Sequence, residues 1–198
     1  MKKYFFIIVF LIAAWLLFHH SKANWQGQLA LDNPIQSSDN LPSAWNYKDF
    51  TITPRAQYHI KAIILSKHYY WGDVEIEDTI SKYDLALGWG PMSDGAVINQ
   101  MNITQGSRWY NYAWSKTPPI DVADIISHSS NHHIIAANQD ILDIISHFKI
   151  YQLVEMEGYL VDIQNFQKNW YWHTSLSRFD TGGGACKIFW VTSAFSIN

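Results

Sequence analysis

The feature that most constrains this chain is the apolar run at its N-terminus. The run extends from Tyr4 to Phe18, follows Lys2 and Lys3, and ends at the polar residue His19. A positive start before an apolar stretch is the pattern of a secretory signal or of an N-terminal anchor, and such lysines stay in the cytoplasm. We therefore exclude residues 1–23 from the globular fold and expect the rest of the chain to be exported.

The length of the run leaves two outcomes open. It has 15 residues, just below the roughly 17 to 25 that span a bilayer, and polar residues up to Ala23 can extend it as an interfacial end. We expect a single pass through the inner membrane at residues 4–18, with the domain in the periplasm. In the alternative, the small residues Ser21 and Ala23 mark a signal-peptidase site, and cleavage near Ala23 releases a periplasmic or secreted domain.

The remaining chain divides into a linker and one domain. Residues 24–48 contain turn formers such as Asp32-Asn33-Pro34 without a sustained period, which predicts a linker. Residues 49–198 have the length of a single globular β-rich domain. Because 48% of the residues are hydrophobic, the chain can bury enough apolar surface to fold, and a disordered tail is excluded.

Short strands account for most of the domain. Residues 55–66 alternate apolar and polar side chains, residues 151–163 do so if Gly158 absorbs a bulge, and residues 170–177 and 186–195 are two further strands. Residues 103–114 predict a hairpin that turns at Gln105-Gly106. The predicted fold class is α+β and β-dominated: a small barrel of bent strands, of the oligonucleotide- and oligosaccharide-binding kind, behind an N-terminal transmembrane or signal helix.

Helices are expected to be few and short. Ile141, Ile144, Ile145 and Phe148 have helical spacing, so we predict a helix over 140–148. Residues 79–87 are compatible with a helical turn before the loop at Gly88-Trp89-Gly90-Pro91. Ser93 or Asp94 is suited to capping a short helix that runs to Met101.

Charge and cysteine content exclude several classes of protein. The chain has 14 Lys and Arg against 17 Asp and Glu. Without residues 1–23, which hold three lysines and no acids, the balance is 11 against 17, or −6, so we expect no nucleic-acid partner. Cys186 is the only cysteine, so the chain has no internal disulfide and no cysteine-based zinc site.

Cys186 is also a candidate nucleophile, with a histidine as base. A strand position beside Ile188 and Trp190 instead predicts a small buried apolar side chain that faces the interior.

The densest polar cluster is His128-Ser129-Ser130-Asn131-His132-His133. Imidazoles that meet on one face can bind a metal ion, so His128, His132 and His133 form a candidate ligand or metal cluster. The intervening Ser-Ser-Asn favours a polar loop, and no HExxH pattern accompanies the histidines. We predict no confident metal site and no cofactor.

Two further polar segments are interpreted as loops. Asp180-Thr181-Gly182-Gly183-Gly184 resembles an anion-binding nest, but strand residues follow it where a phosphate loop requires a helix. We therefore expect a glycine-rich loop that shapes the fold. The acids Asp73, Glu75, Glu77 and Asp78 lack EF-hand spacing and predict a solvated loop.

Three motifs carry a resemblance. They are Asp84-Leu85-Ala86-Leu87-Gly88-Trp89-Gly90-Pro91-Met92-Ser93-Asp94, Ser127 to His133, and Asp180 to Cys186. As a set they resemble a group of uncharacterised, membrane-anchored proteobacterial proteins, over about residues 50–191. The resemblance implies a bacterial source and an exported domain, and supplies no mechanism. It implies functional importance for the three loops and their candidate residues Trp89, Asp94, Asn131, Asp180, Thr181 and Gly183.

Two functions remain open on this basis. The β architecture and aromatic richness, together with the lack of a catalytic signature, favour a membrane-tethered envelope module that binds a protein partner or a glycan without catalysis. The alternative is a periplasmic hydrolase or metal-dependent enzyme that uses His128, His132 and His133.

Overall fold

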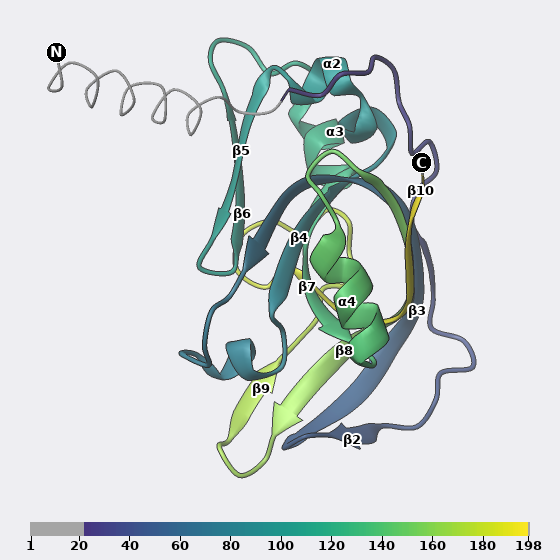
Figure 1. The fold of residues 1–198 in the computed structure, drawn as a ribbon, viewed down its shortest axis with the longest axis vertical. Helices are drawn as coiled ribbons and strands as arrows, with labels where there is room; N and C mark the ends of the chain where they lie inside the picture. Colours follow the sequence, from purple (N-terminus) through teal and green to yellow (C-terminus); the bar gives the residue numbers. More distant parts are fainter. Residues whose placement is uncertain (1–21, 198) are drawn as a thin grey trace, which may run out of the picture.

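Strands dominate the folded part of the chain, as predicted. The computed structural model describes residues 22–197, and five of their strands pair in the order β3–β4–β7–β10–β8. β8 also pairs with β3, so the sheet closes on itself as a ring (Figure 1). β7 and β10 run parallel, while the other neighbours in the ring are antiparallel. The ring strands are β3 (Phe50–Tyr69), β4 (Tyr83–Gly88), β7 (Ser129–Ala136), β8 (Leu153–Asn165) and β10 (Lys187–Ile197).

Shorter strands and helices surround the ring. β1 and β2 pair with β3, β9 pairs with β8, and β5 and β6 form a separate hairpin. The short strands are β1 (Ile35–Ser37), β2 (Trp45–Tyr47), β5 (Met101–Gly106), β6 (Trp109–Trp114) and β9 (Trp170–Trp172). The helices are α2 (Gly95–Ile98), α3 (Val122–Ser127) and α4 (Gln139–His147), with 3₁₀ turns η1 (Ile76–Thr79) and η2 (Gly90–Ser93).

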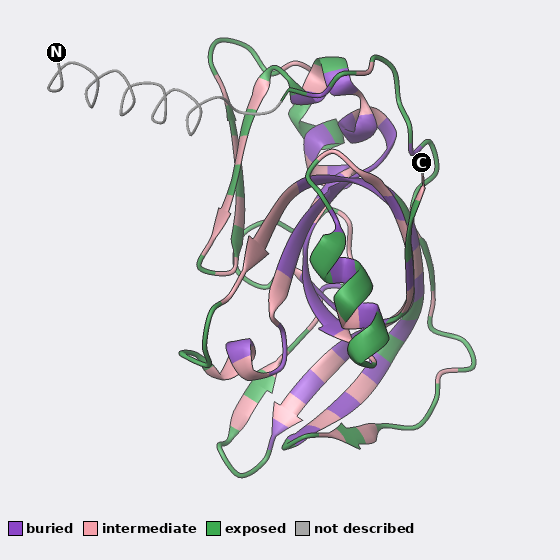
Figure 2. Ribbon diagram, in the orientation of Figure 1, coloured by how far each residue is buried: buried purple, intermediate pink, exposed green. Residues whose placement is uncertain are grey.

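The inside of the ring is the main hydrophobic core. Alternate side chains of each ring strand point inward, as the period of a strand requires. Helix α4 lies across one end of the ring (Figure 1), and Ile141, Ile145 and Phe148 complete the core. The helix begins at Asn138, whose side chain accepts the Ile141 N–H. Figure 2 shows the buried and the exposed faces of α4, and the predicted helix over 140–148 is confirmed within one residue.

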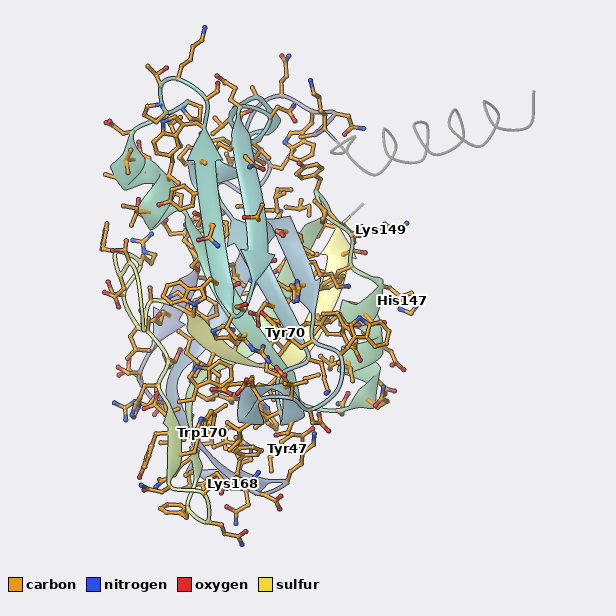
Figure 3. All side chains as sticks on the ribbon, turned by 90° about the vertical axis from the view of Figure 1, so that its left-hand side faces the viewer. Tyr47, Tyr70, His147, Lys149, Lys168 and Trp170 are labelled. Carbon is orange, nitrogen blue, oxygen red and sulfur yellow. The ribbon has the colours of Figure 1, made fainter. Side chains whose placement is uncertain are left out.

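Two further apolar clusters cover parts of the outer face of the ring. The first, the outer aromatic cluster, packs β2 and β9 onto the ring; Figure 3 shows two of its members, Tyr47 and Trp170. It comprises Trp45, Tyr47, Phe50, Ile52, Ile135, Val161, Ile163, Trp170, Trp172, Ile188 and Trp190, with Ile76, Ile80, Ala137 and Tyr159 at its edges. The second packs the hairpin, α2 and α3 against Ile63, Leu65 and Ala86. The outer face between these two clusters is polar, and the candidate site lies there.

The inward face of β10 differs from the prediction. Phe189 and Val191 point into the ring, whereas Ile188 and Trp190 belong to the outer aromatic cluster. The prediction that Cys186 lies on an inner face together with Ile188 and Trp190 is therefore wrong. Both faces of β10 are apolar because both are covered, so alternation along the strand does not reveal which face is inside.

The segment around the three histidines also differs. The sequence predicts a loop from His128 to His133, but residues 129–136 form β7, so this prediction is wrong. Serine and asparagine favour turns only weakly, and pairing with β4 on one side and β10 on the other overrides that preference. As a consequence His132 and His133 point to opposite faces of the sheet.

Other local predictions hold in part. Residues 83–88 form β4, so a helical turn over 79–87 is wrong beyond the 3₁₀ turn η1. The hairpin is confirmed, but the turn predicted at Gln105-Gly106 is wrong, because both residues belong to β5. The turn lies at Ser107 and Arg108, both left-handed at φ of 51° and 66°. Asp94 caps α2 by accepting the Ala96 N–H, but the helix ends at Ile98.

The bulge predicted at Gly158 is wrong: Val154, Met156 and Leu160 face inward and Val161 and Ile163 outward, so β8 alternates without one. The bulge lies instead on the partner strand β10, at Thr192. At Gly158 a side chain would collide with the Trp190 carbonyl.

Residues 24–48, predicted as a linker, carry β1 and β2 and lie along the domain. Trp25 Nε1 donates to the Ser93 carbonyl at 3.0 Å, and the Ala30 N–H donates to Ser93 Oγ at 3.1 Å. This segment therefore contributes to the fold. The predicted membrane segment at residues 4–18 lies outside the described residues. Among residues 22–197, no helix combines the length and the hydropathy needed to cross a bilayer.

Candidate functional site

Four polar side chains meet on the outer face of the ring, and we call them the outer polar patch: Asp84, Asn131, His133 and Cys186. Asp84 on β4 lies directly opposite His133 on β7, and its Oδ1 is 2.8 Å from His133 Nδ1. Cys186 immediately precedes β10, which runs parallel to β7 with Lys187 opposite His132. This register places the thiol beside Asn131, whose Nδ2 donates to Sγ at 3.7 Å.

Asp84 is the centre of the patch. Its carboxylate is only 1% exposed and accepts from Arg108 Nη1 at 2.8 Å, Tyr70 Oη at 2.9 Å and Asn131 Nδ2 at 3.3 Å, in addition to His133. Burial alone would raise the pKa of Asp84, but the charges of His133 and Arg108 and these hydrogen bonds outweigh it and lower that pKa. The carboxylate is thus held ionised.

Arg108 fastens the hairpin to the sheet. From the turn between β5 and β6 it pairs with Asp84 and, through Nη2, with Asp78 Oδ1 at 2.6 Å. Its guanidinium carbon lies 3.6 Å from the centroid of the Tyr70 ring, and the backbone N–H of Arg108 donates to Tyr70 Oη at 2.7 Å. Figure 3 shows Tyr70 close to this turn. Asp78, predicted as part of a solvated acidic loop, is in fact buried.

The two adjacent histidines have opposite electrostatic environments. His133 is buried, which disfavours its charged form, but the neighbouring Asp84 and Cys186 overcome this and raise the pKa of His133 to about 9. His132 lies inside the ring, where burial and the nearby Lys187 lower its pKa to about 3. Its Nε2 is 3.2 Å from Tyr58 Oη, a hydrogen bond within the core. At neutral pH His133 is therefore an imidazolium and His132 is neutral.

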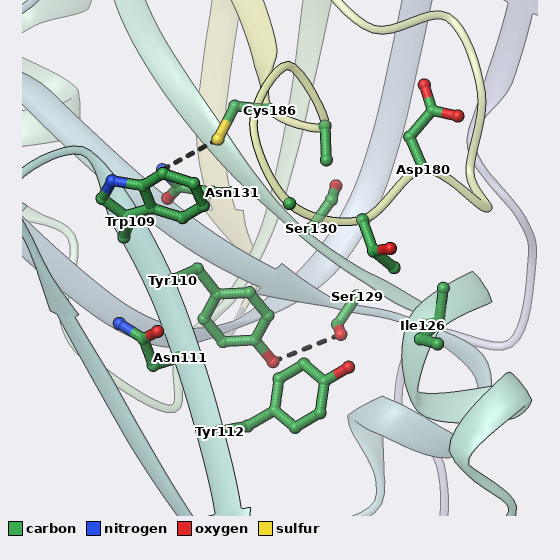
Figure 4. A pocket seen from close by; sticks show the side chains of 13 residues that line it. Trp109, Tyr110, Asn111, Tyr112, Ile126, Ser129, Ser130, Asn131, Asp180 and Cys186 are labelled. Atoms are coloured by element: carbon green, nitrogen blue, oxygen red, sulfur yellow. Dashed lines mark hydrogen bonds between the residues drawn. The ribbon is translucent and has the colours of Figure 1, made fainter.

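A pocket of about 350 Å³ opens beside the outer polar patch (Figure 4). Strand β6 forms one wall, β7 forms the floor, and the loop before β10 forms the opposite wall. Its lining residues are Trp109, Tyr110, Asn111, Tyr112, Ile126, Ser129, Ser130, Asn131, Asp180, Thr181, Gly182, Ala185 and Cys186. Aromatic rings and uncharged polar groups therefore dominate the lining, and Asp180 is the only Asp, Glu, Lys or Arg among these residues.

Specific contacts order the walls of this pocket. Tyr110 Oη donates to Ser129 Oγ at 3.2 Å, and the Tyr110 and Tyr112 ring centroids are 5.5 Å apart (Figure 4). The Trp109 side chain is half-exposed at the rim. Ser130 Oγ is buried and has no hydrogen-bond partner among residues 22–197; alternation along β7 turns it toward the inside of the ring, on the face of His132.

The glycine loop forms the wall opposite the aromatic residues. Gly182 and Gly184 are left-handed, with φ of 76° and 85°, which favours glycine, whereas Gly183 has no positive φ. The Ala185 N–H donates to the Gly182 carbonyl at 3.2 Å, and Asp180 Oδ2 accepts from Ser175 Oγ at 2.7 Å. The prediction of a structured glycine-rich loop agrees with this geometry, and the same loop also lines the pocket.

The structure brings together some of the predicted site residues. Asn131, Asp180 and Thr181 line the pocket, and Gly183 lies in the same loop. Trp89 and Asp94 lie elsewhere: Trp89 is buried, and its Nε1 donates to Asn33 Oδ1 at 3.2 Å.

The three histidines do not share a site. His132 is in the core, His133 is on the outer polar patch, and the His128 ring packs against Gly90. Within residues 22–197 no three His, Cys, Asp or Glu side chains are placed to hold a metal ion.

Sequence reasoning missed Arg108 and Asp84 as members of the site. No local pattern marks them, because their contacts join residues more than 20 positions apart. Comparison of the chain with family models, curated proteins and solved structures gave no match. Functional inference therefore depends on the geometry of the pocket and the patch.

Proposed function

We propose that this chain is a membrane-tethered module of the bacterial envelope that binds a glycan in the pocket between β6, β7 and the glycine loop. The observation that carries the proposal is the lining of the pocket. Trp109, Tyr110 and Tyr112 supply aromatic surface, and hydroxyl and amide groups supply hydrogen bonds. A sugar presents apolar ring faces and many hydroxyls, so it suits both kinds of wall.

The charge of the pocket supports a neutral ligand. None of its lining residues is Lys or Arg, and the nearby Arg108 is engaged by Asp78 and Asp84. A phosphate-bearing ligand or a nucleic acid would require cationic groups at this position. Asp180 adds a negative charge to the rim, which further disfavours anions.

The arrangement of the ring also supports the proposal, by analogy. Numbered along the chain, the five ring strands pair in the order 1-2-3-5-4-1, and α4 connects the third to the fourth. We propose that this ring is the small barrel of the oligonucleotide- and oligosaccharide-binding kind. Ligands of that fold bind across the second and third strands and the loops between strands 1 and 2 and strands 4 and 5. The outer polar patch and the glycine loop lie in the corresponding positions.

The structure around Ala23 supports an uncleaved anchor. The Ala23 side chain is buried, its N–H donates to Asn99 Oδ1, and Asn99 Nδ2 donates to its carbonyl, both at 2.9 Å. Cleavage after Ala23 would remove this residue from the fold. We therefore propose that residues 4–18 remain as the anchor, with the domain in the periplasm. Activity of a periplasm-only reporter fused after Asn198 tests this topology, and activity of a cytoplasm-only reporter contradicts it.

Binding is tested with the full-length protein and neutral oligosaccharides of N-acetylhexosamines, by calorimetry and by the quenching of tryptophan fluorescence. We expect saturable binding, weakened roughly 5- to 150-fold by Trp109→Ala, because stacking on one aromatic ring contributes roughly 1 to 3 kcal/mol. Tyr171→Ala is the matched control, since Tyr171 is similarly exposed on β9 and does not line the pocket. Equal affinities of the Trp109 and Tyr171 variants, or saturable binding only of phosphorylated sugars, would contradict the proposal.

A further inference from the structure

We propose that Cys186 is a nucleophilic thiol that accepts an acyl group from the ligand in this pocket, with His133 as the proton carrier and Asp84 as the residue that positions it. The inference rests on the proposed glycan binding and names the substrate class as an O-acylated sugar, that is, a carboxylic ester of a sugar hydroxyl. It differs from the histidine-cluster enzyme considered from the sequence, because only one of those three histidines takes part.

The thiol lies where the pocket meets the outer polar patch. Sγ accepts from Asn131 Nδ2 and donates to the Arg108 carbonyl, both at 3.7 Å (Figure 4 shows the first contact). His133 Nδ1 is held by Asp84 Oδ1 at 2.8 Å, so Nε2 is the ring nitrogen that would act on the thiol. Asn131, which donates to the thiol, also donates to Asp84 Oδ2 at 3.3 Å, so the thiol and the His133–Asp84 pair belong to one connected group. Cys186 precedes β10, His133 lies on the neighbouring strand β7, and Asp84 lies on β4, the next strand along the sheet. This is the order of a nucleophile, a base and an acid that orients the base.

Contacts with neighbouring side chains hold the His133 imidazole in place. Trp172 lies across it, with ring centroids 4.5 Å apart, and Asp84 is held in turn by Arg108 and Tyr70. Asp78 and Asp84 face Arg108 and the His133 imidazolium, so the buried charges balance when His133 is protonated. A fixed, charged imidazole beside a thiol is the arrangement that activates cysteine nucleophiles.

The pocket also favours acyl transfer over cleavage of a glycosidic bond. Glycosidases generally use two carboxyl groups about 5 to 10 Å apart, whereas Asp180 is the only acid among the lining residues. An ester requires a donor for the carbonyl oxygen, which becomes an oxyanion. Asn131, which lines the pocket and whose Nδ2 already donates to Sγ at 3.7 Å, can supply that hydrogen bond.

The reaction balances with water as the co-reactant. In the reactive ionisation state a Cys186 thiolate faces the His133 imidazolium. Sulfur attacks the ester carbon, the bond from that carbon to the sugar oxygen breaks, and His133 gives its proton to the departing sugar oxygen. Water then attacks the thioester and gives a proton to His133, which releases the carboxylic acid and restores the thiolate and the imidazolium.

The test uses full-length protein and p-nitrophenyl acetate as a small ester probe. We expect a burst of about one equivalent of p-nitrophenolate and, by peptide mapping, an acetyl group on Cys186. Acylation of Cys186 should be at least tenfold faster than that of N-acetylcysteine at the same pH, because the protein supplies the imidazole. Cys186→Ala should abolish the burst, and His133→Gln should slow acylation at least tenfold. His173→Gln, at the exposed position that follows β9, should leave acylation unchanged.

Several outcomes separate this inference from the proposed glycan binding. If Cys186 of the unaltered protein is acylated no faster than N-acetylcysteine, the inference is overturned. This comparison needs no variant, so it holds even if His133→Gln does not fold. Acetylation confined to lysines overturns it as well. Retention of oligosaccharide binding by Cys186→Ala leaves the binding proposal standing in either case. Conversely, a burst on Cys186 without oligosaccharide binding supports the nucleophile and contradicts the glycan.

Discussion

The two adjacent histidines of β7, on opposite faces of the strand, have opposite electrostatic environments. His132 points into the ring, where it has a tyrosine hydroxyl but no carboxylate as its partner. His133 points outward onto Asp84, within a group of buried charges. Burial opposes a proton on both, yet the pKa is about 3 for His132 and about 9 for His133. The charged neighbours therefore decide the outcome: Asp84 and Cys186 stabilise the proton on His133, whereas Lys187 adds to the effect of burial on His132.

This contrast separates a structural region from a candidate functional one. The inner face of β7 carries the neutral His132 in a closely packed region, opposite the buried Lys187. Its outer face carries the His133–Asp84 ion pair and borders a pocket, with the Cys186 thiol beside Asn131. Groups whose pKa is strongly shifted by a specific partner, next to a pocket, are typical of functional sites. The comparison predicts that changes on the two faces have different signatures.

The largest effect is expected at Asp84. Asp84→Ala removes the partner of two buried cations, Arg108 and His133, and we expect a loss of about 3 to 5 kcal/mol of unfolding free energy. Asp73→Ala is the control, because its bond to Lys82 is at the surface, where ion pairs contribute little to stability. Denaturant unfolding measures both. Similar losses in the two variants would contradict a buried charge network on the outer face.

The dependence of stability on pH comes next. Unfolded histidine titrates near 6.5, so stability falls as the pH drops from about 6.5 to 3, where only the unfolded state protonates His132. It also falls as the pH rises from about 6.5 to 9, where only the folded state keeps the His133 proton. By magnitude of the shifts, the acidic window corresponds to roughly 5 kcal/mol and the alkaline window to roughly 3 kcal/mol of unfolding free energy.

Two variants assign these windows in thermal unfolding across the pH range. His132→Gln should flatten the acidic fall and leave the alkaline fall intact, and His133→Gln should do the reverse. An unchanged pH profile in both variants would show that other groups control the stability.

A smaller effect is expected inside the ring. Tyr58→Phe removes the hydroxyl that bonds to His132 and leaves a buried ring nitrogen without that partner, so we expect a loss of about 1 to 2 kcal/mol. Tyr171→Phe, at an exposed position, should change stability by less than about 0.5 kcal/mol. Binding to the pocket should be unaffected in both variants, since neither tyrosine lines it. Loss of binding by Tyr58→Phe would break the division between the two faces.

The smallest effect concerns the glycine loop. Gly184→Ala places a side chain at φ of 85°, which costs about 1 to 2 kcal/mol. Gly183→Ala has no positive φ and no heavy atom within 4 Å of the added Cβ, so we expect a change of less than about 0.5 kcal/mol. Equal unfolding midpoints for the two variants would contradict the loop conformation.

Much of the architecture follows from the sequence, because alternation and helical spacing are local. Helix α4, the hairpin and most of β3, β8 and β10 could be predicted in this way. β7 could not, since its serines and asparagine favour turns and only pairing on both edges makes them a strand.

The candidate site was less accessible to sequence reasoning. Three residues of the sequence motifs that we expected to be functional line the pocket: Asn131, Asp180 and Thr181. Cys186 was assigned to the wrong face because both faces of β10 are covered by apolar residues. The partnership of Asp84, Arg108 and His133 arises only when the ring brings distant segments together.

Histidine NMR titration of the full-length protein tests the central claim, that the outer face of β7 holds a charged site and its inner face a neutral core. The His132→Gln and His133→Gln variants assign the two imidazole signals. We predict a midpoint near pH 9 for His133, which shifts downward in Asp84→Asn, and no midpoint above about pH 5 for His132. Two midpoints close to 6.5, unaffected by Asp84→Asn, would contradict the claim.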